Sequence, residues 1–212
     1  MEAARPVPKF SIADAITYSW NAAFRNFASV MLVSVVVFAG NALVFLISTV
    51  NGNAGLNLAF QLLGVLVDLL LILGLVRAAL DVVQGRTPTL AEVFRPEGYG
   101  PYLVASILFL VGVWLGIILL VVPGVIFGIV FQFYGYVVAE HPDVSATVAL
   151  QRSAQITRGV RIRLFGLSVV LLLVNLAGAM LCGVGLVVTY AVTAIALAYV
   201  YRLLTGQPVA AL

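Results

Sequence analysis

The sequence predicts an all-α polytopic membrane protein, a bundle of about six transmembrane helices in three hairpins with short cytoplasmic interfacial helices, in one domain, 1–212. Nonpolar residues make up 63% of the chain, charged residues only 9%, and the mean hydropathy is +1.17. Soluble domains contain about 45–50% apolar and 25% charged residues. So much apolar surface cannot be enclosed in a water-soluble core of this size, so the excess must face lipid.

Six apolar runs have the length of membrane spans, because a hydrocarbon core of about 30 Å needs about 20 helical residues. They cover 27–50, 57–80, 102–122, 124–139, 164–181 and 184–203. The first two are separated by Asn51-Gly52-Asn53-Ala54-Gly55, which has turn composition, and the last two by the weaker break Cys182-Gly183.

The third and fourth runs together form a nearly uninterrupted apolar stretch, 102–139. A single helix of that length would extend roughly 57 Å at 1.5 Å per residue, nearly twice the hydrocarbon thickness. Pro123-Gly124 lies near the middle, where proline removes a backbone donor and glycine permits a turn. We therefore predict a tight hairpin there.

Charge placement supports six crossings independently. The connections 51–56, around 123 and around 182 contain no Lys or Arg, so all eleven basic residues fall on one side. A single crossing over 102–139 would place the arginines of 152–163 outside, against the positive-inside rule. The sequence thus predicts a multi-pass membrane protein with both termini cytoplasmic. The basic residues form no stripe typical of nucleic-acid binding.

The amino-terminal segment 1–26 is polar and mixed before the first apolar run, so no cleavable signal peptide is expected. Cys182 is the only cysteine, which excludes an internal disulfide. A buried inert thiol is the favoured interpretation, and an intermolecular disulfide is the alternative.

An interfacial amphipathic helix is predicted over 11–26. Ile12, Ile16, Trp20 and Phe24 recur at intervals of four, which places them on one helical face. Trp20 is the expected anchor at the lipid head groups. Ser11-Ile-Ala-Asp14 fits a capping pattern at the helix start.

Two more cytoplasmic helices are predicted, over about 89–95 and 143–157. Thr89-Leu-Ala-Glu92 repeats the capping pattern, and Asp143 follows a proline as a candidate N-cap. Arg152 interrupts the apolar face of the second helix, so that helix is expected to pack on protein. A proline, a helix and a hairpin recur three times, as either an internal repeat or the ordinary alternation of a hairpin protein.

A resemblance covers most of the chain. It is carried by Val122-Pro-Gly-Val-Ile-Phe, Ala139-Glu-His-Pro-Asp-Val-Ser-Ala, Ala149-Leu-Gln-Arg-Ser-Ala, Thr157-Arg-Gly, Leu164-Phe-Gly, Tyr18-Ser-Trp20 and Phe24-Arg-Asn26-Phe. These segments resemble the uncharacterised bacterial six-helix membrane proteins of the YciC-like type and the related glycerophosphoryl diester phosphodiesterase membrane domain. The chain departs from the pattern with Val122 in place of the usual isoleucine. The resemblance implies the six-helix architecture and the bacterial inner membrane, and it implies no particular activity.

Asp68 is the most informative candidate site residue, because it lies near the middle of the run 57–80. An ionised acid at the bilayer centre costs at least roughly 2.5–3.5 kcal/mol, so Asp68 must face the bundle interior or be protonated. Gln132, Asn175 and Thr193 lie at similar depths in other runs and could complete an intramembrane polar site. The alternative is that Asp68 is a packing group hydrogen-bonded to one of those amides.

Other charged residues have simpler interpretations. Arg77 and Asp81 are spaced i, i+4 and are expected to form an ordinary helix-end ion pair. An arginine cluster sets the topology and could also contact anionic lipid head groups or a protein partner: Arg152, Arg158, Arg161 and Arg163.

No catalytic, metal-binding or cofactor signature is present. His141 is the only histidine, so neither a Ser-His-Asp triad nor a histidine metal cluster can be assembled. A membrane enzyme is therefore not expected, and no cofactor is implied. The two functional hypotheses are a scaffold or accessory subunit of a membrane or cell-envelope complex, and a small transporter or channel that uses Asp68.

Overall fold

The computed structural model describes residues 10–50, 54–180 and 184–211. These ranges are helical without any β-strand, and the helices are α1 Ile12–Arg25, α2 Phe27–Val50, α3 Ala54–Val83, α4 Leu90–Val93, α5 Tyr99–Leu119, α6 Val121–Phe131, α7 Tyr134–Glu140, α8 Ala146–Ile156, α9 Arg161–Met180 and α10 Val184–Thr205. Six segments of the described chain are long and apolar enough to cross a membrane: Phe27–Ile47, Gly55–Val83, Tyr99–Leu119, Val121–Glu140, Arg161–Met180 and Gly185–Thr205. The predicted all-α polytopic class is confirmed.

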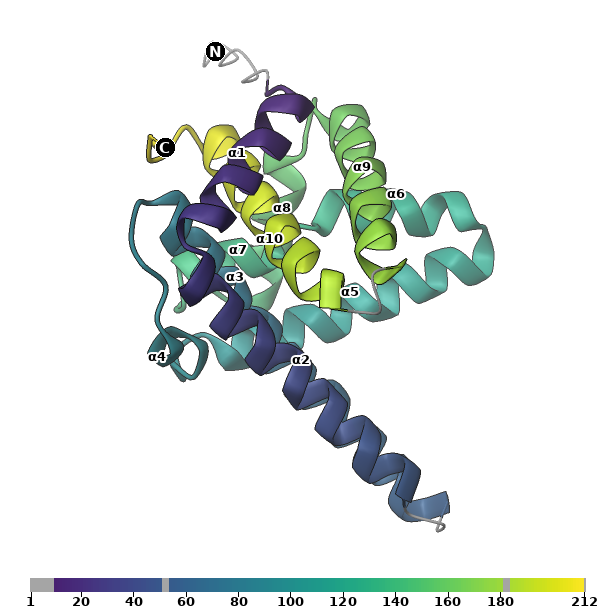
Figure 1. Ribbon diagram of the computed structural model, residues 1–212. Helices are drawn as coiled ribbons and strands as arrows, with labels where there is room; N and C mark the ends of the chain where they lie inside the picture. Colours follow the sequence, from purple (N-terminus) through teal and green to yellow (C-terminus); the bar gives the residue numbers. More distant parts are fainter. Residues whose placement is uncertain (1–9, 51–53, 181–183, 212) are drawn as a thin grey trace.

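The spans pair as three hairpins, α2 with α3, α5 with α6, and α9 with α10 (Figure 1). Helix α10 lies at the centre and contacts α1, α2, α3 and α9. Its side chains Ala191, Ala196 and Ala198 are fully buried, and such small residues allow neighbouring helices to approach closely. The last span of the chain is therefore the core of the bundle.

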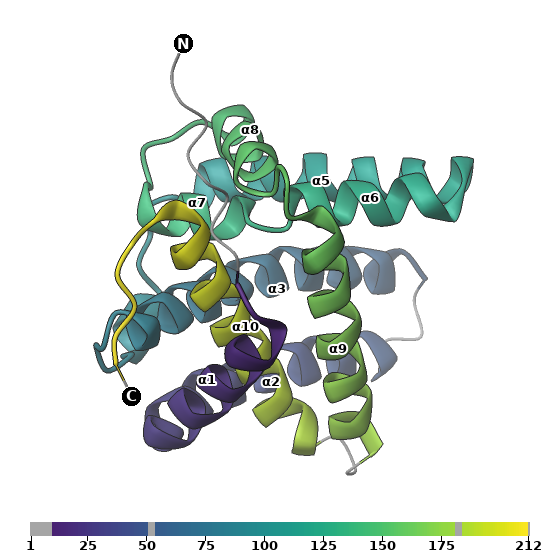
Figure 2. The same ribbon diagram turned by 90° about the horizontal axis from the view of Figure 1, so that it is seen from above.

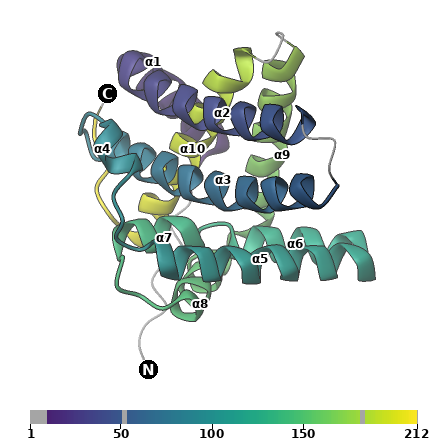
Figure 3. The ribbon, with the colours of Figure 1, turned by 90° about the horizontal axis from the view of Figure 1, so that it is seen from below.

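The α2–α3 and α5–α6 hairpins point in different directions (Figure 1). Viewed from below, the four helices appear side by side, and the carboxyl ends of α2 and α5 lie at the same end of the molecule (Figure 3). Helix α9 crosses the α5–α6 pair instead of running along it (Figure 2). The distal parts of these hairpins expose large apolar side chains, including Leu43, Leu58, Leu62, Ile118 and Leu119. Such a surface matches a lipid environment.

The α5–α6 turn lies three residues before the predicted position. Leu120 is extended, with φ −168° and ψ 140°, and α6 begins at Val121. Pro123 therefore occupies the first turn of α6, where a missing N–H removes no intrahelical bond. A Cβ on Gly116 would lie 2.6 Å from the Cα of Gly124, so the hairpin is closed by backbone contact between two glycines.

The predicted fourth span, 124–139, is two helices rather than one. Helix α6 ends at Phe131 and α7 begins at Tyr134. The side chain of Ser153 on α8 accepts a hydrogen bond from the N–H of Phe133 at 3.0 Å and donates to the carbonyl of Val130 at 3.1 Å. Because α8 supplies these bonds, the backbone is hydrogen-bonded at the break.

Of the three helix caps predicted from the sequence, one is observed. Ser11 caps α1 and accepts from the N–H of Asp14 at 3.3 Å, as predicted. Thr89 precedes α4 but its side chain makes no capping bond. Helix α8 starts later than predicted, because Ser145 and not Asp143 supplies the capping oxygen.

Helix α1 buries its small side chains instead of its large ones. Ala15, Ser19 and Ala22 are buried, whereas Trp20 remains 42% exposed. Trp20 and Phe24 have ring centroids 5.4 Å apart on the outer side of the helix. The predicted apolar face is therefore exposed at its carboxyl-terminal half, and anchoring of Trp20 in lipid head groups stays a prediction.

Candidate functional site

Asp68 pairs with the neighbouring helix of its own hairpin. The amide of Asn41 on α2 donates to Oδ1 of Asp68 on α3 at 2.8 Å, and also to the carbonyl of Val37 at 3.0 Å. Asn41 is exposed and Asp68 is half-buried. The expectation that Gln132 or Asn175 would bond Asp68 is wrong, because the adjacent antiparallel helix offers an amide at the same depth.

Asn175 and Thr193 form a second polar pair, between α9 and α10. The Asn175 amide donates to Oγ1 of Thr193 at 2.8 Å and to the carbonyl of Leu171 at 2.9 Å. Oδ1 of Asn175 is buried and has no hydrogen-bond partner among the described residues. This pair joins the two helices of the last hairpin inside the membrane span.

Gln132 and Thr193 line a cavity of about 260 Å³ between α3, α5, α7 and α10. Four phenols share its lining, those of Tyr102, Tyr134, Tyr136 and Tyr190. Nε2 of Gln132 is buried and unpartnered within the described ranges. Of the four predicted polar residues, Gln132 and Thr193 therefore meet at this cavity and Asn175 reaches it through Thr193, whereas Asp68 does not line it.

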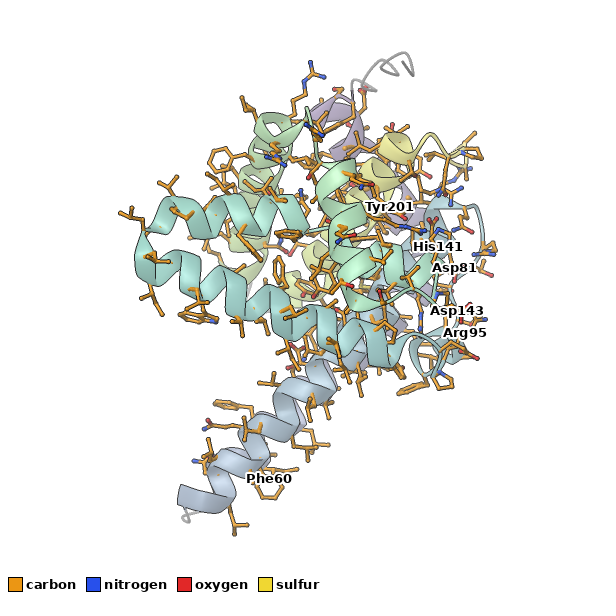
Figure 4. All side chains as sticks on the ribbon, turned by 180° about the vertical axis from the view of Figure 1, so that it is seen from behind. Phe60, Asp81, Arg95, His141, Asp143 and Tyr201 are labelled. Atoms are coloured by element: carbon orange, nitrogen blue, oxygen red, sulfur yellow. The ribbon has the colours of Figure 1, made fainter. Side chains whose placement is uncertain are left out.

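Sequence reasoning missed a cleft of about 530 Å³ at the carboxyl ends of α3, α7 and α10. We call it the charged cleft; its ionisable lining residues are Arg77, Asp81, Arg86, Glu92, Arg95, Glu140, His141 and Arg202. Figure 4 shows Asp81, Arg95 and His141 gathered at this end, far from Phe60 on the α2–α3 hairpin. The sequence did show charged residues near the ends of three spans, which could have indicated a shared polar site. It could not show that these residues lie next to one another, because that depends on how the helices pack.

The predicted ion pair between Arg77 and Asp81 is wrong. Asp81 instead pairs with Arg86 at 2.7 Å. The guanidinium of Arg77 donates to three backbone carbonyls of the segment before α5, those of Glu92, Arg95 and Glu97, with the bond to Arg95 at 2.6 Å. It also lies 5.3 Å from the centroid of the Tyr99 ring. Arg77 is only 5% exposed, so it anchors this segment to α3 from inside.

Glu140 organises the other side of the charged cleft. Its carboxylate accepts from the Tyr201 hydroxyl at 2.8 Å and from the Gln207 amide at 2.9 Å. Nη1 of Arg202 lies 3.5 Å from the same carboxylate. Nε of Arg202 donates to the carbonyl of Pro208 at 2.9 Å. These contacts tie α7, α10 and the segment after α10 together. Because the carboxylate of Glu140 finds its partners within the protein, these contacts indicate a structural role for Glu140.

Tyr18 fixes α1 to the same end. Its ring stacks on Tyr199 with centroids 4.5 Å apart, and its hydroxyl donates to the carbonyl of Ala210 at 3.1 Å. Burial, with a smaller contribution from Tyr199, raises the pKa of the Tyr18 phenol. Tyr18 therefore remains a neutral donor throughout the physiological pH range.

The arginine cluster lies at the corner between α8 and α9. Arg158, Arg161 and Arg163 line one groove, whereas Arg152 lies outside it on α8. All four are exposed, and none makes an ion pair with another described residue. The described part of the chain also holds no group of three His, Cys, Asp or Glu side chains placed to bind a metal.

Relatives of this chain occur in mycobacteria. It is 31% identical over 236 aligned residues to the uncharacterized protein Rv2560 of Mycobacterium tuberculosis, covering 94% of this chain and 70% of the relative. The uncharacterized proteins Mb2590 of Mycobacterium bovis and MT2637 of another Mycobacterium tuberculosis strain match with the same identity and coverage. No family model and no solved structure matches the chain. The chain is therefore a multi-pass membrane protein of the bacterial family that includes these three mycobacterial proteins.

Proposed function

We propose that this protein is a non-enzymatic scaffold or accessory subunit of a larger complex in the bacterial inner membrane. Its α2–α3 hairpin binds a transmembrane helix of another subunit, and its termini and charged cleft face the cytoplasm. The resemblance to YciC-like six-helix proteins supports the architecture and the setting. The observation that carries the proposal is the Asp68–Asn41 pair on the projecting hairpin.

The pair lies on a surface that one chain leaves uncovered. Asn41 is exposed and Asp68 half-buried, and the hairpin extends beyond the other helices (Figures 1 and 4). A midplane aspartate in lipid costs at least roughly 2.5–3.5 kcal/mol. Contact with a protein helix that offers hydroxyl or amide donors would remove much of that penalty.

Further polar residues extend this surface along α3. Asn57, Gln61 and Asp68 are spaced at four and seven residues, which places them on one helical stripe. Gln61 is exposed, and its amide donates to Oδ1 of Asn57 at 3.2 Å. A row of amides and one acid on a projecting helix offers hydrogen bonds to a partner over several turns.

The first experiment purifies the tagged protein from native membranes in mild detergent. A stoichiometric second protein is expected, and it should be lost from the variant Asp68→Leu. Leu66→Ala is the matched control, because Leu66 is exposed on the opposite face of α3. A pure monomer from native membranes, or a complex that survives Asp68→Leu, would refute the proposal.

A second experiment maps the surface by placing a photoreactive residue at Gln61, with Leu119 at the exposed end of α5 as the control position. Illumination of native membranes should give an adduct with the partner from position 61 and none from position 119. An adduct only with a second copy of this chain would count against a role as an accessory subunit.

A transporter that uses Asp68 is the second candidate. The tyrosine-lined cavity favours it, because its lining includes Gln132, whose buried Nε2 has no hydrogen-bond partner among the described residues. Asp68→Asn separates the two candidates. It retains an oxygen that can accept from Asn41, so the complex should persist, whereas a flux that needs the ionisable carboxyl should disappear.

A further inference from the structure

Arginines without an ion pair gather at one corner of the described chain. The carboxylates of Asp81, Glu92, Glu97 and Glu140 are engaged by arginines of the charged cleft, in ion pairs of 2.7 to 3.8 Å. The arginine cluster between α8 and α9 has no such partner anywhere in the described ranges. It therefore presents uncompensated charge next to the apolar spans.

Three of these arginines converge on one groove. The groove has a volume of about 990 Å³ and is lined by Arg158, Arg161 and Arg163. Gly159 between α8 and α9 has φ +85°, a left-handed conformation that reverses the chain and that side chains rarely adopt. The 20-residue helix α9 starts at Arg161, so its amino-terminal N–H groups add partial positive charge at the same place. Three guanidinium groups that line one groove can donate several hydrogen bonds to a single phosphate group.

An apolar groove adjoins the arginine groove. It has a volume of about 530 Å³, lies between α6 and the first turn of α9, and is lined by Val121, Val122, Val125, Ile126, Ile129, Arg161, Ile162 and Phe165. The two grooves share Arg161 and Ile162. Ile162 is 88% exposed although it sits among arginines. Figure 2 shows α9 starting beside α6 and then running steeply away from it.

We propose that the two adjoining grooves bind one anionic phospholipid, with its phosphate among Arg158, Arg161 and Arg163 and an acyl chain along α6. The occupant is a lipid because one surface requires both a phosphate and a hydrocarbon chain. A soluble phosphate would leave the apolar groove empty. An acidic protein segment would not fill the apolar groove either, because its side chains are polar. The site is separate from the α2–α3 hairpin, so it does not depend on the proposed function.

The test measures lipid retention by native mass spectrometry after release from nanodiscs of equimolar phosphatidylglycerol and phosphatidylcholine. We expect one phosphatidylglycerol to be retained preferentially. One basic residue near a phosphate contributes about fivefold to binding, so the triple variant Arg158→Gln, Arg161→Gln and Arg163→Gln should lose about a hundredfold. Arg25→Gln is the charge control, since Arg25 is exposed elsewhere and makes no described ion pair.

A groove-filling variant tests the acyl-chain part without changing charge. Ile126→Trp should block the apolar groove and reduce phosphatidylglycerol retention at least tenfold, while Ile118→Trp, on the exposed end of α5, should not. Thermal melting verifies that each variant is folded. Undiminished binding by Ile126→Trp, or equal competition by deacylated glycerophosphoglycerol, would overturn the lipid site in favour of a phosphate surface. Equal retention of both lipids by the unmodified protein would also overturn it.

Discussion

Replacing Arg77 by methionine should release the segment before α5 from α3. Arg77 is 5% exposed, and its guanidinium donates to three backbone carbonyls. Hydrogen bonds to charged groups contribute about 1.5–3 kcal/mol each, and the burial penalty of the cation offsets part of their sum. We expect a net loss of about 3 kcal/mol, because methionine fills much of the space and makes none of the bonds.

Circular dichroism melting in detergent measures this loss. For a chain of this size, about 3 kcal/mol corresponds to a decrease of about 6–12 °C in the midpoint. Trypsin should also cleave faster after Arg86, which lies in the connection between α3 and α4 that leads into the anchored segment. Arg95→Met is the control. Its side chain is 53% exposed and forms only surface ion pairs, so its loss should remain below about 1 kcal/mol.

A midpoint for Arg77→Met within about 2 °C of the unmodified protein would refute the reasoning. So would an equal loss in Arg95→Met, because the decrease would then report a general effect of removing positive charge from this end of the molecule. Unchanged cleavage after Arg86 would separately show that Arg77 does not hold the segment in place.

Two further variants test the hairpin and the helix break. Gly116→Ala should destabilise the protein by about 1–3 kcal/mol, since its Cβ would meet the backbone of Gly124 at 2.6 Å, whereas Gly128→Ala meets nothing and should be neutral or slightly stabilising in the same melting assay. Ser153→Ala removes the acceptor for the buried N–H of Phe133 and should cost about 2 kcal/mol, with faster amide exchange at Phe133 by NMR; unchanged exchange would contradict this assignment.

The sequence was informative wherever the signal is local. Hydropathy and length identify six spans, and the absence of basic residues from alternate connections predicts three hairpins. The Ser11 cap depends only on residues within one turn, so it was also predictable. The α5–α6 turn was placed three residues late because Pro123 is compatible with both a turn and a first helical turn.

Contacts between spans could not be predicted in the same way. Gln132, Asn175 and Thr193 were chosen for Asp68 by depth, yet Asp68 bonds Asn41, and Gln132 lines the tyrosine cavity instead. Depth fixes only the position along the membrane normal. The rotation of each helix and its neighbours decide which groups at one depth meet.

The sequence by itself determined the fold class, the order of the spans and the asymmetric distribution of charge, because these follow from composition along a single helix and from the cost of burying charge in lipid. Only the tertiary structure decided that α10 is the core, that Ser153 supports the break before Phe133, and that Arg77 anchors a distant segment. These features join residues far apart in the chain. Their energies exist only after the helices have packed.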